Sequence, residues 1–227
     1  MKNILFIIFT LIISVPGFAQ KTAVLDAFAK YNIDTSVLNI NARMNAEKYA
    51  FDVKTITTIE DKQQINIGKH DPTLPEGGQW LLISADGKNP SDKQVEQFRK
   101  AHDVNAPVAK PDEQTYKVVK DDGSSLVISY QPDEASLVED NKFLKGFITT
   151  MYINAKTGRL ERSETKSSGP FKIKIFNADQ MNSNISYIYI DSQKEYLPLK
   201  EEVLIDLKIV GRTAETITTI EYSGYKK

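Results

Sequence analysis

The two histidines are the first residues whose side chains could do chemistry, because imidazole can act as a base or bind a metal ion. His70 and His102 are each followed by an aspartate in the sequence. His102 shares a helical stripe with Val95 and Phe98 and lies near the end of a predicted helix, where a histidine interacts favourably with the helix dipole. His70 lies at the end of a predicted strand, beside a proline-containing loop. These positions favour structural roles for both histidines over catalysis or metal binding.

Other patterns for catalysis and cofactor binding are missing from the sequence. There is no cysteine, so thiolate nucleophiles, disulfides and cysteine-based zinc sites are excluded. No serine stands in a Gly-Xaa-Ser-Xaa-Gly turn, and no phosphate-binding loop, EF-hand or His-Glu-Xaa-Xaa-His motif occurs. The acidic pairs Asp133-Glu134 and Glu139-Asp140 could supply a general acid and base, as in a glycosidase, but adjacent carboxylates in a loop usually face water. We therefore expect a protein that is not an enzyme and uses no cofactor or metal.

Charge is balanced along the chain. The sequence has 29 basic and 30 acidic residues, a formal net charge of −1. The two signs are interleaved along the predicted strands, whereas a nucleic-acid or membrane surface would need a basic cluster. We expect no nucleic-acid partner.

Large apolar side chains on the predicted strand faces are the strongest candidates for binding. Such a face can be packed solid, or it can leave room for an apolar ligand. The ten tyrosines, against a single tryptophan, suit the rim of a half-wet cavity, because the ring is apolar and the hydroxyl tolerates water. The candidate lining residues are Phe51, Val53, Phe147, Met151, Ile153, Tyr187 and Tyr189. An ordinary packed core is the alternative for the same set.

The first nineteen residues have the three parts of a secretory signal peptide. Lys2 is basic, the stretch from Ile4 to Val15 is apolar, and Pro16-Gly17 precedes a small residue at Ala19. The apolar stretch is shorter than the roughly 20 residues that a permanent membrane helix needs. We expect cleavage after Ala19 and a periplasmic protein that does not span the membrane, with an uncleaved anchor as the alternative. Because there is no cysteine, it cannot be a lipoprotein.

Residues 20–227 are expected to form one mainly β (α+β) domain. Residues 24–31 and 92–102 have helical spacing, and Ser91 with Gln94 forms a capping-box pattern. The predicted strands are residues 49–59, 63–68, 79–84, 116–120, 124–130, 147–154, 159–166, 170–176, 185–191, 195–210 and 212–225. Residues 105–112 are predicted to be an internal crossover. About eleven strands predict a single curved antiparallel sheet, a half-open barrel whose concave face the two short helices cover.

The second half of the chain resembles the periplasmic lipoprotein-carrier superfamily, the LolA/LolB-like group. The resemblance rests on the hairpin at 151–160, the strand at 188–191, the Tyr196-Leu197-Pro198 bend and the closing strand at 217–225. The segment from Trp80 to Pro90 is more similar to a less characterised exported branch of that superfamily. The resemblance implies an incomplete barrel of about eleven strands, closed off by helices, with a hydrophobic cavity that can shield acyl chains.

Together, these features predict a non-enzymatic periplasmic binding protein. Its partner would be a lipid, an acyl chain or a lipoprotein. The alternative is a protein-interaction or envelope-stress-sensing module, in which the same fold has a filled core and binds through a sheet edge or a loop.

Overall fold

The computed structural model describes residues 16–39, 45–102, 109–173, 175–209 and 212–227. The helices are α1 (Pro16–Lys30) and α3 (Asp92–His102), with short 3-10 helices η1 (Thr35–Leu38), η2 (Asn45–Lys48), η3 (Glu113–Thr115), η4 (Glu134–Ser136) and η5 (Glu139–Gly146). The strands are β1 (Ala50–Ile59), β2 (Lys62–His70), β3 (Trp80–Ala85), β4 (Lys117–Asp121), β5 (Ser125–Tyr130), β6 (Phe147–Asn154), β7 (Arg159–Ser167), β8 (Phe171–Ile173), β9 (Phe176–Ile190), β10 (Glu195–Ile209) and β11 (Arg212–Lys226).

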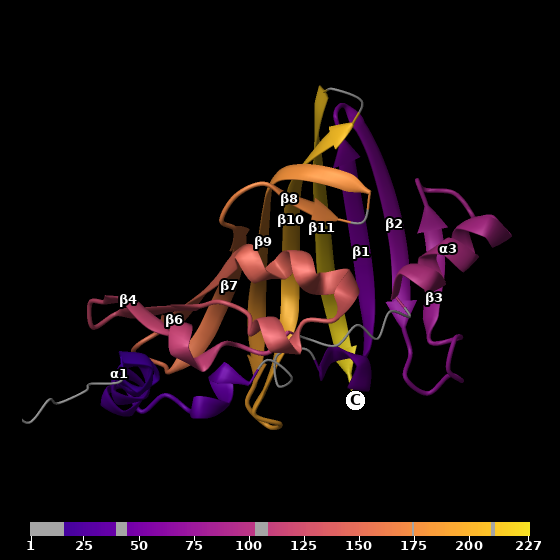
Figure 1. The fold of residues 1–227 in the computed structure, drawn as a ribbon. Coiled ribbons are helices and arrows are strands. Elements are labelled where there is room, and N and C mark those ends of the chain that lie inside the picture. Colours follow the sequence, from indigo (N-terminus) through magenta and orange to yellow (C-terminus); the bar gives the residue numbers. More distant parts are fainter. Residues whose placement is uncertain (1–15, 40–44, 103–108, 174, 210–211) are drawn as a thin grey trace, which may run out of the picture.

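All eleven strands belong to one antiparallel sheet, shown in Figure 1. Their order is β3-β2-β1-β11-β10-β9-β7-β6-β5-β4, and β8 pairs with β9 beside this path. Within the described residues, the first and last strands of this order, β3 and β4, do not pair with each other, so the sheet is not closed into a barrel. The prediction of an open antiparallel sheet of about eleven strands is confirmed.

The strand pattern in the sequence explains the sheet. In β1, Phe51 and Val53 are buried while Asp52 between them is exposed, as expected when successive side chains point to opposite faces. The tight turns have glycines where the backbone needs a positive φ: Gly123 has φ 81° between β4 and β5, and Gly158 has φ 68° between β6 and β7. Each of these turns joins two antiparallel strands into a hairpin.

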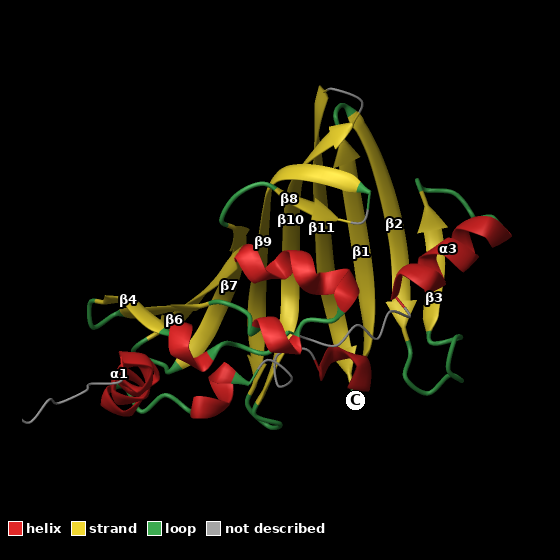
Figure 2. Cartoon of the chain, in the orientation of Figure 1, coloured by secondary structure: helices red, strands yellow, loops and turns green. Residues whose placement is uncertain are grey.

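Helices cover one face of the sheet, which we call the inner face (Figure 2). The residues that cross-strand pairing places on the inner face include Met151, Ser163, Ile185, Glu201 and Ile220, in adjacent register from β6 to β11. The outer face carries pairs of polar side chains. In one of them, the guanidinium carbon of Arg162 lies 3.4 Å from the ring centroid of Tyr152.

The predicted helix at 92–102 forms as α3. Gln94 Oε1 accepts hydrogen bonds from the Ser91 backbone N–H (2.9 Å) and from its hydroxyl (2.8 Å), which fixes the start of the helix. Phe98 of α3 then packs directly onto the backbone of Gly68 in β2, where an added Cβ would lie 2.4 Å from the ring. Only glycine allows the helix to approach so closely.

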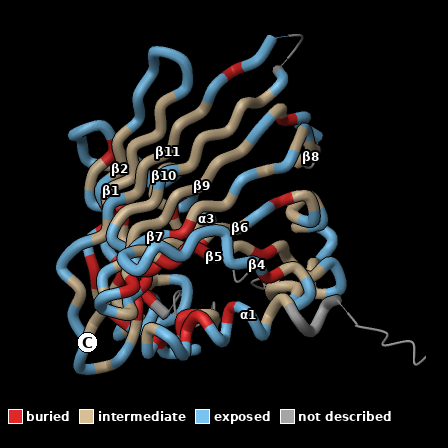
Figure 3. The backbone as a smooth tube through the Cα atoms, turned by 90° about the vertical axis from the view of Figure 1, so that its left-hand side faces the viewer, coloured by how far each residue is buried: buried red, intermediate tan, exposed pale blue. Residues whose placement is uncertain are grey.

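Buried residues gather at one end of the sheet (Figure 3). Near α1 the inner face is densely packed, whereas the far halves of β1, β2, β9, β10 and β11 are mostly half-buried or exposed. The inner face is therefore covered unevenly, and part of it remains accessible.

Three sequence predictions differ from the structure. The predicted strand 170–176 is instead the short β8 followed by the start of β9, and β9 extends over fifteen residues to Ile190. The first half of β9 was missed because it is rich in polar residues such as Asn177 and Gln180, which reduce its apolar alternation. The first helix begins at Pro16 instead of Val24. Residues 1–15 of the predicted signal peptide and residues 105–108 of the predicted crossover lie outside the described residues.

Candidate functional site

Two packed clusters occupy the inner face. The first, which we call the α1 cluster, joins α1 and η1 to strands β5, β6, β7 and β10. Its buried members are Val24, Ala27, Phe28, Ile33, Val37, Tyr116, Leu126, Ile128, Tyr130, Met151, Ile153, Leu160 and Tyr196. The second, the α3 cluster, has the buried members Ala46, Tyr49, Phe51, Val53, Leu82, Phe98 and Leu197. Each cluster places a helix against a different part of the sheet.

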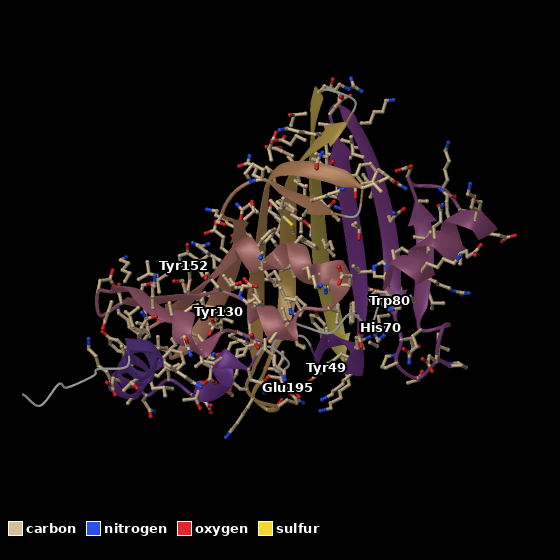
Figure 4. All side chains as sticks on the ribbon, in the orientation of Figure 1. Tyr49, His70, Trp80, Tyr130, Tyr152 and Glu195 are labelled. Carbon is tan, nitrogen blue, oxygen red and sulfur yellow. The ribbon has the colours of Figure 1, made fainter. Side chains whose placement is uncertain are left out.

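A cavity of about 330 Å³ is bounded by residues of both clusters. It is lined by Ala46, Glu47, Phe51, Trp80, Ala101, His102, Tyr130, Thr149, Ser163, Thr165, Ile185, Tyr187, Pro198, Glu201 and Tyr222. Tyr130 comes from the α1 side and Trp80 from the α3 side, and Figure 4 shows these two rings on opposite sides of the molecule's lower half. The volume is within the range of small-molecule sites.

Two further hollows adjoin this cavity. One, of about 640 Å³, shares Glu47, Trp80 and His102 with it, and the other, of about 270 Å³, shares Ala101 and His102. The accessible space therefore continues from the centre of the sheet toward α3.

The cavity wall contains a group of small hydroxyl side chains. Thr149 and Thr165 lie opposite each other on β6 and β7, with their hydroxyl oxygens 3.0 Å apart. The Ser163 hydroxyl is 2.9 Å from the Tyr187 hydroxyl. Farther along the same face, the buried Thr55 hydroxyl has no hydrogen-bond partner among the described residues. The surface is therefore mixed, with apolar rings interrupted by groups that can donate or accept a hydrogen bond.

Glu201 is the charged residue placed deepest in this wall. Its register neighbours are Ile185 on β9 and Ile220 on β11, so apolar side chains flank it on both sides. Burial raises the pKa of the Glu201 carboxyl above its ordinary value. Burial also raises the pKa of the Tyr222 phenol, and the nearby Glu201 charge adds to that shift. Both observations indicate a partly desolvated environment.

The two histidines flank Trp80. The ring centroid of Trp80 is 4.8 Å from that of His70 and 4.1 Å from that of His102. His70 Nδ1 is 2.8 Å from the Tyr49 carbonyl oxygen, and His102 Nδ1 is 2.7 Å from the Phe98 carbonyl oxygen. Because a carbonyl only accepts, Nδ1 is the protonated nitrogen of both rings. The histidines fix Trp80 at the cavity wall, and Figure 4 shows His70 and Trp80 together.

The described side chains of the acidic pairs are not among the residues that line this cavity. Asp133 accepts a hydrogen bond from the Ala135 backbone N–H at 3.0 Å and so begins η4, and Glu134 is 3.8 Å from the Lys145 ammonium. Glu139 pairs with Lys142 at 2.5 Å on the surface. The side chain of Asp140 lies outside the described residues.

The seven predicted lining residues occupy different environments. Phe51 and Tyr187 line the cavity. Val53 belongs to the α3 cluster, and Met151 and Ile153 are buried in the α1 cluster. Tyr189 packs against the α1 cluster, with its ring centroid 4.8 Å from that of Tyr196. Phe147 forms a separate aromatic group with Phe143 and Phe171 beneath η5 and β8.

Sequence reasoning missed most of the polar lining. Glu201, Ser163 and Thr165 were not among the predicted lining residues, because the prediction rests on large apolar side chains alone. The sequence did contain one signal for Glu201. Alternate residues of a strand share one face, and Glu201 stands two residues before Val203, so an acidic residue continues an otherwise apolar row.

Within the described ranges, no group of three His, Asp or Glu side chains is arranged to hold a metal ion. No helix in the described part of the chain is long and apolar enough to cross a bilayer.

The fold and the cavity define a class of protein: an open antiparallel half-barrel with a mixed apolar and polar hollow on its inner face. No protein-family model matches the chain, and no curated protein matches it. Among solved structures, it is similar to the crystal structure of a DUF1329 family protein from Desulfovibrio piger. That similarity has 9% sequence identity and a TM-score of 0.35, and it covers 94% of this chain and 93% of that chain. At such a TM-score the similarity carries no argument about function.

Proposed function

We propose that this chain is a non-enzymatic binding protein that holds an apolar or amphiphilic ligand, such as a lipid or an acylated chain, on the inner face of its half-barrel. The observation that carries the proposal is the cavity between the two clusters. Aromatic and aliphatic groups from distant strands, including Phe51, Trp80, Ile185 and Tyr187, meet there without filling the space. Sites for small molecules are typically concave, largely apolar and supplied with a few polar groups.

The proposal places this activity outside the cytoplasm, in line with the signal-peptide pattern of residues 1–19. Lipoprotein-carrier-like shielding of an acyl chain is the role that the resemblance to the LolA/LolB-like group suggests for such a hollow. N-terminal sequencing of the protein recovered from a periplasmic extract should give Gln20 as the first residue. A chain retained in the membrane with its first residues intact would contradict export by cleavage.

The test of binding is native mass spectrometry of the protein purified without detergent, followed by lipid extraction. Ile185→Arg places a guanidinium beside Glu201, directly opposite it on the neighbouring strand. The new side chain should occupy the cavity without disturbing the buried clusters. Ile188→Arg is the matched control, because Ile188 lies on the other face of the same strand and is 41% exposed.

We expect an apolar species to accompany the wild-type protein and the Ile188→Arg variant, and to be lost from Ile185→Arg. If the wild-type protein has only the mass of the polypeptide, and that mass does not increase on adding a monoacylglycerol, the proposal is contradicted.

A second candidate is a protein-interaction or envelope-stress-sensing module, and the observation that favours it is the sheet edge. Strand β4 ends the sheet order, and all five of its residues are exposed. The side chain of Val119 is 59% exposed and gives this edge an apolar group that a partner could contact. An unpaired edge can receive a strand from another protein. Replacing Val119 with lysine should abolish such an interaction and leave the cavity unchanged. Crosslinking in cell extracts would detect the loss of the interaction with the partner protein.

A further inference from the structure

The charged groups of the described residues that line the cavity have one sign. They are Glu47 at η2 and Glu201 on β10, and the other titratable residues of that described lining are His102, Tyr130, Tyr187 and Tyr222. Among the described residues that line it, none is a lysine or an arginine. Among its described lining residues, a ligand that enters this space therefore meets carboxylates and neither a lysine nor an arginine.

Glu201 has neither a hydrogen-bond partner nor an ion-pair partner among the described residues. Lys200, next to it in sequence, points to the outer face, where its ammonium is 3.1 Å from the Glu202 carboxylate. On the inner face, Glu201 has Ile185 and Ile220 on its two sides.

An unpaired carboxylate in such a place is unfavourable for the empty protein, because a partly buried charge loses hydration and gains nothing in return. A ligand that supplies a hydrogen-bond donor or a positive charge restores that lost interaction. A ligand with its own carboxylate would instead place two like charges in one poorly hydrated space, which disfavours binding.

We propose that Glu201 receives the polar end of the bound molecule, and that the ligand is an amphiphile whose polar end is an ammonium group or another hydrogen-bond donor, not a free fatty-acid anion. This inference rests on the proposed function and adds the chemistry of the ligand to it. The aromatic walls at Phe51, Trp80 and Tyr187 contact the apolar part of the ligand. The hydroxyl groups of Ser163 and Thr165 accept or donate the remaining hydrogen bonds of its polar end.

The inference can be tested with probes that share one alkyl chain and differ only in the polar end: dodecylamine, dodecanol and dodecanoate. Each is titrated below its micelle-forming concentration against the protein loaded with N-phenyl-1-naphthylamine, a neutral dye that fluoresces in apolar surroundings. At neutral pH we expect dye displacement to show that dodecylamine binds about tenfold more tightly than dodecanoate, with the affinity of dodecanol between the two.

Glu201→Gln removes the charge with little change of shape, and it should reduce the preference for dodecylamine to about threefold or less. Glu202→Gln is the matched control, because it removes a carboxylate one residue away on the outer face, and it should keep the wild-type preference.

Equal binding of the amine and the carboxylate to the wild-type protein would overturn the inference and leave the proposed function intact. The same conclusion would follow from a preference that Glu201→Gln does not change. If neither the dye nor any of the three amphiphiles binds, both the inference and the proposed function fail.

Discussion

At Glu201, a carboxylate stands between two isoleucine side chains on the inner face of the sheet. No positively charged group in the described part of the fold neutralises this carboxylate. Folding therefore removes part of its hydration without supplying a replacement, which is unfavourable. Binding sites commonly retain such unfavourable groups, because the ligand supplies the missing partner. The stability of the protein and its choice of ligand should therefore depend on the same side chain.

The first prediction concerns the pH dependence of stability. Because burial raises the pKa of Glu201 in the folded protein, the ionised carboxylate opposes folding, and this cost grows as pH rises from the ordinary glutamate pKa of about 4.3 through the folded value. Glutamine carries no charge at any pH. We expect Glu201→Gln to raise the free energy of unfolding at pH 7 by on the order of 1 kcal/mol, with the gain disappearing below about pH 4.

Urea denaturation at several pH values measures this difference. Glu202→Gln should show no such pH-dependent gain, because its ion pair with Lys200 is exposed and contributes little. A Glu201→Gln variant that is less stable than the wild type at pH 7 would show that the carboxylate has a favourable partner.

At the scale of the elements, the helices that cover the inner face determine how much of it remains open (Figure 2). α3 packs against β3 and reaches the backbone of β2 at Gly68, whereas α1 covers β5 and β6 through its buried side chains. The cavity is lined by residues of the central strands β7, β9 and β10, which the helices do not cover completely. Changes that loosen either helix should therefore affect the shape of the cavity as well as stability.

The second prediction concerns the contact of α3 with β2. A Cβ at position 68 would lie 2.4 Å from the ring of Phe98 and 3.0 Å from the Leu81 carbonyl oxygen. Gly68→Ala should therefore destabilise the protein by about 1–3 kcal/mol, the usual cost of overpacking. Thermal unfolding measures the loss, and Gly169→Ala serves as the control, because nothing lies within 4 Å of its added Cβ. Equal stability of the two variants would mean that α3 does not pack as closely as described.

The third prediction concerns α1. Phe28 is 1% exposed at the centre of the α1 cluster, whereas Leu25 on the same helix is 36% exposed. Phe28→Ala should lower the free energy of unfolding by about 3–5 kcal/mol. Leu25→Ala should change it by about 0.5 kcal/mol, as is usual for surface positions. If both variants unfold at the same urea concentration, α1 does not contribute to the folded core.

At the scale of the whole molecule, the sheet was predictable because its signals are local. Alternating side chains and glycine turns at Gly123 and Gly158 mark the hairpins, and a chain of hairpins produces an open antiparallel sheet. The polar first half of β9 escaped prediction, because its pairing with β10 and β8, and not its own pattern, makes it a strand.

The cavity was harder to predict than the sheet, because its position depends on which inner-face residues the helices cover. Met151 and Tyr187 have similar apolar patterns in the sequence, yet the first is buried in the α1 cluster and the second lies at the cavity wall. Glu201 has no local signal beyond its place in the alternation of β10. Only the register of β9, β10 and β11 shows that it faces inward between isoleucines.

The central claim, that the inner-face cavity holds an apolar chain, can be measured with the protein's own fluorophore. Trp80 is the single tryptophan of the sequence and lines the cavity. Bromine quenches indole fluorescence only at close contact, so bromoundecanol, a neutral alcohol with a brominated chain, reports entry directly. We expect saturable quenching of Trp80 in the wild-type protein and in Ile188→Arg, and at least about tenfold weaker binding in Ile185→Arg. Quenching that never saturates, or that is the same in Ile185→Arg as in the wild type, would contradict binding in this cavity.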